Sequence, residues 1–174
     1  MNTTILHAAG IAAVLVVGFA ADSFAHATLD VGQMPSGSYY KAVVNVPHGC
    51  DGSPTLKVRV QIPDGVTGVK PQPKAGWQVE IVRAKLDKPI DAGHGRMISE
   101  TVRELVWTGR LADDNLEEFR IQMKLPDQPG QTVWFPVVQE CEKGFVRWIE
   151  IPAAGKSSDD LKFPAPGVKL LPKP

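Results

Sequence analysis

The residue with the clearest chemical potential in this sequence is His26, which follows Ser23-Phe24-Ala25 at the end of an apolar N-terminal run. Small residues at positions −3 and −1 are typical of a signal-peptidase site, and they predict a cut after Ala25. His26 would then carry a free α-amine as well as its imidazole, and the two form one chelate ring around a metal. Nitrogen donors in tetragonal geometry favour Cu(II). The alternative is that His26 is only the residue at which processing ends.

Other possible donors are spread along the chain, and each also has an ordinary structural explanation. His48 ends a predicted strand beside a cysteine, where it could ligate a metal or fill a partly buried position. His94, between two glycines, is expected in an exposed loop, and either histidine could be the second one of an oxidative copper site. Glu118, with Glu117 before it, is expected on the outward face of a strand, as a ligand or as a solvated carboxylate. Trp148 is expected in the core, because burying an indole removes about 150–250 Å² from water.

The two cysteines, Cys50 and Cys141, would both be exported with the mature chain. In an oxidising compartment such a pair is more commonly a disulfide than a reactive or metal-binding couple. We therefore expect a disulfide between them. Two free buried thiols and a copper-binding thiolate pair are the alternatives.

These residues must be positioned by β-strands, because apolar and polar side chains alternate through much of the sequence. Strands are predicted at residues 39–46, 56–62, 66–70, 77–84, 102–107, 118–125, 132–141 and 145–151. Residues 87–96 are polar and contain glycines, and they are expected to form a loop around His94. About eight or nine short strands with turn signals between them predict an all-β sandwich, with a β-barrel as the alternative.

The chain divides into three parts: a signal peptide at 1–25, a β-sandwich domain at 26–152, and a Pro- and Lys-rich tail at 153–174 that is extended over the surface or partly disordered. The balance of 19 basic and 19 acidic residues speaks against a nucleic-acid partner and against a polybasic membrane patch. No second long apolar run follows the first, so we expect a soluble, exported protein without a membrane anchor in its mature chain. Hydrolase and phosphate-loop motifs are missing, so we do not expect an enzyme.

Read together, these segments resemble the YcnI-like family of exported bacterial copper-binding proteins. The resemblance covers nearly the whole mature domain. In chain order it is carried by Ala25-His26-Ala27-Thr28-Leu29, Gly37-Ser38-Tyr39-Tyr40, Val46-Pro47-His48-Gly49-Cys50, Val58-Arg59-Val60-Gln61-Ile62-Pro63-Asp64-Gly65, Lys70-Pro71-Gln72-Pro73-Lys74-Ala75-Gly76-Trp77, Val106-Trp107-Thr108-Gly109, Glu117-Glu118-Phe119, Phe135-Pro136-Val137-Val138-Gln139-Glu140-Cys141 and Arg147-Trp148.

The resemblance implies an immunoglobulin- or fibronectin-III-like β-sandwich that holds Cu(II) in a monohistidine brace. In such a brace the amine and imidazole of an N-terminal His and a Glu carboxylate bind the metal, and a Trp lies over it. Carried over residue by residue, these are His26, Glu118 and Trp148, with Glu117 and Trp134 as the nearest alternatives.

The function that the resemblance implies is copper trafficking, buffering or delivery in the periplasm, as a copper chaperone with another periplasmic copper protein as a possible partner. Two other functions stay open. One is copper-dependent oxidation that uses His48 or His94 as a second histidine, and the other is an interaction sandwich without metal.

Overall fold

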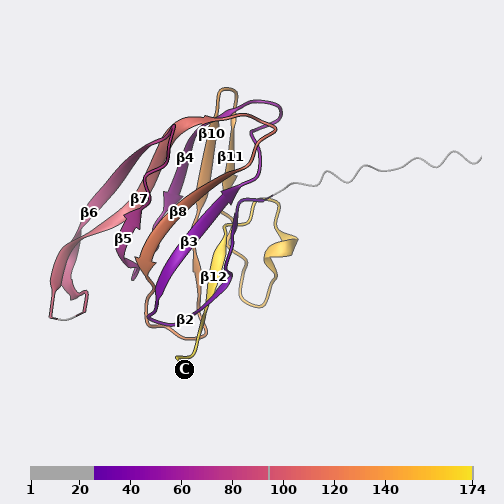
Figure 1. Ribbon diagram of the computed structural model, residues 1–174. Helices are drawn as coiled ribbons and strands as arrows, with labels where there is room; N and C mark the ends of the chain where they lie inside the picture. The colour runs from indigo at the N-terminus through magenta and orange to yellow at the C-terminus, as the bar shows by residue number, and fades with distance from the viewer. Residues whose placement is uncertain (1–25, 94, 174) are drawn as a thin grey trace, which may run out of the picture.

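The computed structural model describes residues 26–93 and 95–173. The predicted signal peptide, residues 1–25, and His94 lie outside the described residues. The described chain contains twelve β-strands and one short 3₁₀ helix (Figure 1). In chain order these are β1 (Thr28–Leu29), β2 (Gln33–Pro35), β3 (Tyr39–Val46), β4 (Thr55–Gln61), β5 (Thr67–Pro71), β6 (Gln78–Asp91), β7 (Met97–Leu111), β8 (Glu117–Lys124), β9 (Thr132–Trp134), β10 (Val137–Cys141), β11 (Phe145–Trp148), η1 (Ser158–Asp160) and β12 (Gly167–Leu171).

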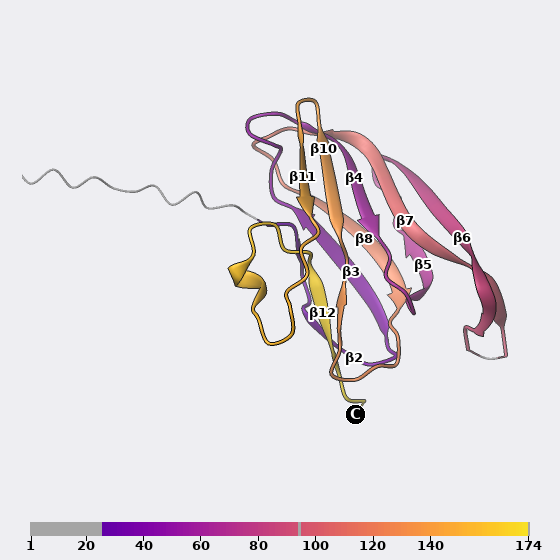
Figure 2. The ribbon, with the colours of Figure 1, turned by 180° about the vertical axis from the view of Figure 1, so that it is seen from behind.

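Two sheets face each other and form the body of the molecule (Figures 1 and 2). One has the strand order β1-β3-β8-β5, and the other has the order β11-β10-β4-β7-β6. A third, small sheet with the order β2-β12-β9 lies beside them. The predicted all-β sandwich is therefore confirmed. The described chain has twelve strands rather than eight or nine because β1, β2 and β12 were not predicted and the predicted strand at 132–141 is divided into β9 and β10.

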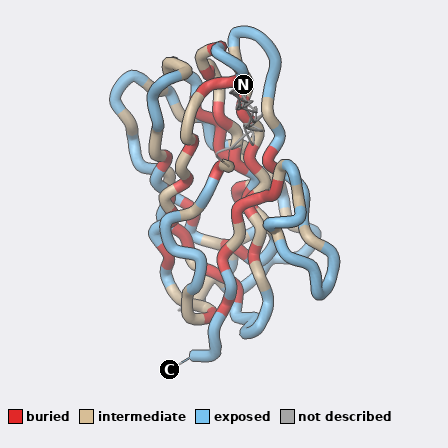
Figure 3. Tube along the Cα trace, turned by 90° about the vertical axis from the view of Figure 1, so that its right-hand side faces the viewer, coloured by how far each residue is buried: buried red, intermediate tan, exposed pale blue. Residues whose placement is uncertain are grey.

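The core between the two sheets is made by the inward residues of alternating strands. On β8, Phe119, Ile121 and Met123 are each at most 1% exposed, and the residues between them face outward. Trp107 of β7 packs against Phe119 at a ring-centroid distance of 5.1 Å, which joins one sheet to the other. In Figure 3 the buried segments run along the strands, whereas the connections between strands are mostly exposed. The alternation of apolar and polar residues in β8 thus predicts which face of the strand is buried.

The hairpin of β6 and β7 is longer than the sequence predicts. Residues 87–96 were expected to form a loop, but β6 continues to Asp91 and β7 begins at Met97. Ile90 pairs with Ile98 near the tip. The hairpin projects beyond the facing sheet (Figure 1), so both of its faces meet solvent there and polar side chains are compatible with strand pairing. The predicted loop is therefore shorter than expected: residues 87–91 belong to β6, and the connection between the strands begins after Asp91.

The C-terminal segment requires a correction. Residues 153–174 were expected to form a tail outside the domain, but β12 lies within this segment and is part of the fold. Val168 and Leu170 are 0% exposed, and β12 pairs with β2 in parallel and with β9 in antiparallel orientation. Two apolar residues that alternate with Lys169 are enough for a five-residue strand, but prolines and lysines on both sides hide that pattern in the sequence.

The predicted disulfide between Cys50 and Cys141 is confirmed. It joins the connection between β3 and β4 to the end of β10, across 91 positions of the sequence. Such a bridge is typical of extracytoplasmic proteins, because the cytosol keeps thiols reduced. Within residues 26–93 and 95–173, no helix has the length and apolar character needed to cross a membrane.

Candidate functional site

His26 is the first residue of the described chain and lies two positions before the start of β1 at Thr28. Thr28 of β1 pairs with Asn45 of β3, so His26 enters the sandwich beside the end of β3. The imidazole of His26 lies against the indole of Trp148, with ring centroids 5.5 Å apart and ring planes inclined by 62°. The fold thus brings together two residues that the family resemblance assigns to one metal site.

Trp148 is the last residue of β11 and is only 1% exposed. Besides His26, its ring contacts Phe163 at a centroid distance of 5.5 Å. Its Nε1 donates a hydrogen bond to Oε1 of Gln139 at 3.4 Å. The indole is therefore a core residue and a neighbour of His26 at the same time, so the structural explanation of Trp148 does not exclude the functional one.

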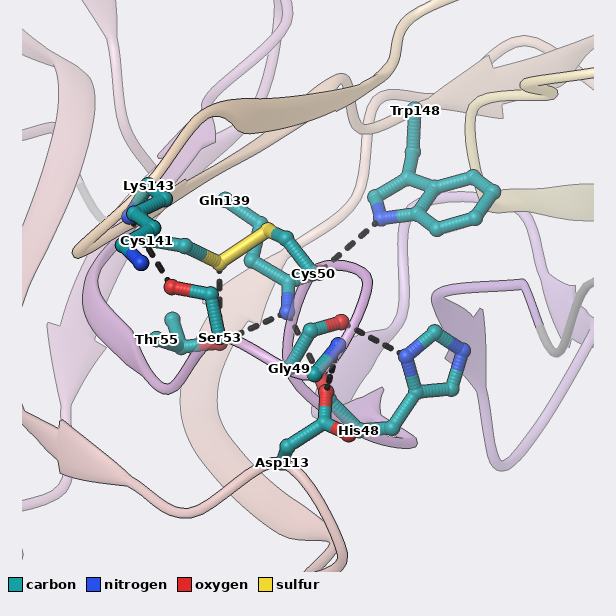
Figure 4. The surroundings of a disulfide bond; sticks show 11 residues. His48, Gly49, Cys50, Ser53, Thr55, Asp113, Gln139, Cys141, Lys143 and Trp148 are labelled. Carbon is teal, nitrogen blue, oxygen red and sulfur yellow. Dashed lines mark hydrogen bonds between the residues drawn. A yellow bond between two sulfur atoms is a disulfide. The ribbon is translucent and has the colours of Figure 1, made fainter.

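His48 lies in the connection after β3, close to the disulfide (Figure 4). Its Nδ1 is 2.6 Å from the carbonyl oxygen of Gly49. A carbonyl oxygen can only accept, so the neutral ring in this contact carries its proton on Nδ1 and keeps the lone pair of Nε2. That lone pair is what an imidazole needs in order to bind a metal. His48 therefore has the protonation pattern of a ligand as well as a local hydrogen bond that orients it.

A buried glutamine, Gln139 of β10, connects His48 with Trp148 (Figure 4). Its side chain accepts from Trp148 and donates through Nε2 to the carbonyl oxygen of His48 at 2.5 Å and to Oγ1 of Thr55 at 2.7 Å. Gln139 was not predicted as a site residue from the sequence. The signal that could have found it is its position on the inward face of β10, where a polar side chain must find hydrogen-bond partners.

Glu118 and Glu117 lie on β8, away from His26. In the sheet, β3 separates β1 from β8, so two strand spacings of about 4.8 Å each lie between them. The carboxylate of Glu118 accepts from Nη2 of Arg120 at 2.9 Å, and that of Glu117 lies 2.6 Å from Nζ of Lys74. Both glutamates line a hollow of about 380 Å³ whose lining does not include His26. In this structure Glu118 and Glu117 are thus engaged by Arg120 and Lys74, and their ligation of a metal at His26 stays a prediction.

His26 lines a different hollow, of about 310 Å³. Trp134 of β9 lies in the same lining, so the alternative to Trp148 is also near His26. Ser158 and Asp159 of η1 contribute to it too. Asp159 is a carboxylate near His26 that the sequence offers no pattern to find, because it lies in the segment expected to be a tail.

The hollow beside His26 offers the imidazole nitrogens of His26 and side-chain oxygens such as those of Ser158 and Asp159. Among residues 26–93 and 95–173, no three or more His, Cys, Asp or Glu side chains gather closely enough to hold a metal by themselves. An α-amine at His26 would exist only after cleavage and would add a strong donor to the imidazole. Both cysteine sulfurs are in the disulfide, so they are not thiolate ligands. Nitrogen and oxygen donors without thiolate suit Cu(II) better than Cu(I).

Comparisons with known proteins establish the family and the fold. A family model described as a domain of unknown function (DUF1775) matches residues 26–170. A crystal structure described as an uncharacterized protein from Nocardia farcinica with an immunoglobulin-like fold is similar, with a TM-score of 0.61 and 24% sequence identity over 84% of this chain and 98% of that chain. At this identity the likeness shows the fold alone, which is immunoglobulin-like. No curated protein matches the chain.

Proposed function

The chain belongs to the DUF1775 family, and from that premise we propose that its mature form is an exported Cu(II)-binding protein. The α-amine and imidazole of His26 form the primary chelate. The observation that carries this proposal is the contact between His26 and the buried indole of Trp148, which fixes the imidazole at an edge of the sandwich. The protein would act in the periplasm in copper trafficking, buffering or delivery, and would hand the metal to another copper protein by ligand exchange.

The remaining positions around the metal need donors beyond His26. Glu118 is the carboxylate that the family resemblance implies, but it would have to leave Arg120 and reach across β3. His48 lies in the connection after β3, the strand that pairs with β1, and its Nε2 lone pair is not used by the contact with Gly49. We therefore place His48 before Glu118 as the second side-chain ligand, and the role of Glu118 stays a prediction.

Ligation by His48 as a second histidine would also be compatible with one alternative, a copper-dependent oxidative enzyme. The two functions differ in one measurable property, which is turnover of oxygen. A binding or delivery protein supplied with copper and a mild reductant should consume oxygen no faster than free copper under the same conditions. Sustained oxygen consumption that depends on His48 would favour the enzyme.

The proposal is tested by titrating Cu(II) into the mature protein that begins at His26. The matched control carries one extra glycine before His26, which keeps every side chain of the domain and removes only the terminal position of the amine. One tightly bound equivalent is expected for the mature protein, and a large loss of affinity is expected for the extended one. Equal affinities would contradict the chelate.

The pH dependence provides a second check. Both nitrogen donors bind metal only after losing their protons, so copper affinity should fall from roughly pH 8 to pH 5, the window set by reference values for α-amines and imidazoles. A constant affinity across this window would speak against nitrogen ligation.

A further inference from the structure

Gln139 is a fully buried polar side chain that contacts two candidate site residues, Trp148 and His48, and also Thr55. It is 0% exposed and lies on β10. Its Oε1 accepts from Nε1 of Trp148 at 3.4 Å, and its Nε2 donates to the carbonyl oxygen of His48 at 2.5 Å and to Oγ1 of Thr55 at 2.7 Å. One amide therefore links β11, β4 and the connection that carries His48 (Figure 4).

The chemistry of the partners determines how the amide is oriented. The indole N–H of Trp148 can only donate, so it requires the oxygen of Gln139. The carbonyl oxygen of His48 can only accept, so it requires the amide nitrogen. Only one orientation of the glutamine satisfies both partners. A methionine of similar volume could satisfy neither, and an ionised glutamate could satisfy only Trp148.

Burial of an indole does not by itself require such a partner in this fold. Trp107 is also 1% exposed, and its Nε1 is buried without a hydrogen-bond partner among the described residues. The same sandwich therefore tolerates one tryptophan whose N–H is unsatisfied and binds the other with a dedicated buried glutamine. What distinguishes Trp148 is its neighbour, because its ring is the one that packs against His26.

We propose that Gln139 is a positioning residue of the copper site. It holds the indole of Trp148 in the orientation that packs against His26, and it holds the main chain of His48, so a single side chain places both histidines relative to each other. This inference rests on the proposed function of His26 as the copper chelate. Gln139 itself does not touch the metal.

The test compares Gln139→Met with Thr55→Val in the mature protein. Gln139→Met keeps the volume and removes all three contacts, whereas Thr55→Val removes one contact of Gln139 and keeps those to Trp148 and His48. In metal-free protein, the NMR signals of the His26 ring protons report the nearby indole through its ring current. We expect these signals to move toward unshifted positions in Gln139→Met and to stay in place in Thr55→Val.

Copper binding supplies the second readout. We expect the affinity for Cu(II) to fall at least tenfold in Gln139→Met, with altered paramagnetic resonance parameters, and to be unchanged in Thr55→Val. A folded Gln139→Met protein with unchanged His26 signals and unchanged affinity would overturn the inference. An equal loss in Thr55→Val would also overturn it, because the effect would then reflect general destabilisation.

If Gln139→Met does not fold, the variant Gln139→Glu provides the test in its place. It retains an oxygen facing the indole and loses the donor to His48, so the His26 ring signals should stay while the His48 ring signals move. Unmoved His48 signals would refute the positioning role. If the wild-type protein binds no copper, the proposed function is refuted. The NMR spectra of the metal-free variants would still show whether Gln139 positions the two histidines.

Discussion

Replacing both cysteines by alanine, in the double variant Cys50→Ala/Cys141→Ala, tests how the fold holds the loop that carries His48. The disulfide is one of several contacts on this loop. The amide of Gly49 also donates to the carbonyl oxygen of Asp113 at 3.2 Å, and Gln139 donates to His48. Because these contacts do not depend on the disulfide, we expect the folded state to persist without it and most of the effect to act on the unfolded chain.

The size of the effect follows from the length of the closed loop. The cross-link spans 91 positions, and the chain-entropy relation for a loop of that length predicts about 4.6 kcal/mol at 25 °C. Measured losses for native disulfides are typically about 2–5 kcal/mol. We therefore expect the free energy of unfolding to fall by about 2–5 kcal/mol. The dependence on denaturant should become steeper as well, because the uncrosslinked chain exposes more surface when it unfolds.

Urea unfolding at neutral pH, followed by tryptophan fluorescence, measures both quantities. Wild-type protein under reducing conditions is the matched comparison, and its curve should move toward that of the double variant. A loss below about 1 kcal/mol would refute the reasoning, because a cross-link of this span cannot be so weak unless the unfolded chain already holds its ends together.

Three other predictions follow from single residues. Leu170→Ala should lower the free energy of unfolding by about 2–5 kcal/mol because Leu170 is 0% exposed, whereas Leu171→Ala, at 37% exposed, should cost much less; equal small losses would contradict the packing of β12. Burial raises the pKa of Tyr40 to about 12, so stability that is fully present below about pH 10, the unfolded value, should be lost as pH rises toward 12. Tyr40→Phe should remove that part of the alkaline loss in unfolding curves measured against pH. His48→Ala should weaken Cu(II) binding in a calorimetric titration more than Glu118→Gln does, and the reverse order would restore Glu118 as the ligand.

Much of the fold could be predicted because alternation is a local property of the chain. In β8 the alternation of apolar and polar residues predicts that Phe119, Ile121 and Met123 point inward, and these three residues are buried. The strand β12 could not be predicted in the same way. It is only five residues long, and what makes it a strand is pairing with β2 and β9, which are far away in the sequence.

The candidate site was harder to predict from the sequence, because its residues lie on different strands and the alternation pattern does not determine the order of the strands in the sheets. His26 could be named from the cleavage pattern alone. Glu118 could be assigned only by resemblance, and the distance set by the intervening strand β3 is a property of the sheet order. Gln139 carries no motif, and its importance becomes visible only when its three partners are placed around it.

The most direct measurement of the central claim is the paramagnetic resonance of Cu(II) bound to mature protein in which every histidine carries ¹⁵N at its α-nitrogen only. At His26 that nitrogen is the free amine after cleavage, and at other histidines it is a main-chain amide. We predict a ¹⁵N coupling of the size found for a directly bound nitrogen, and its loss when one glycine precedes His26. A stoichiometric copper complex without that coupling would contradict the chelate at His26.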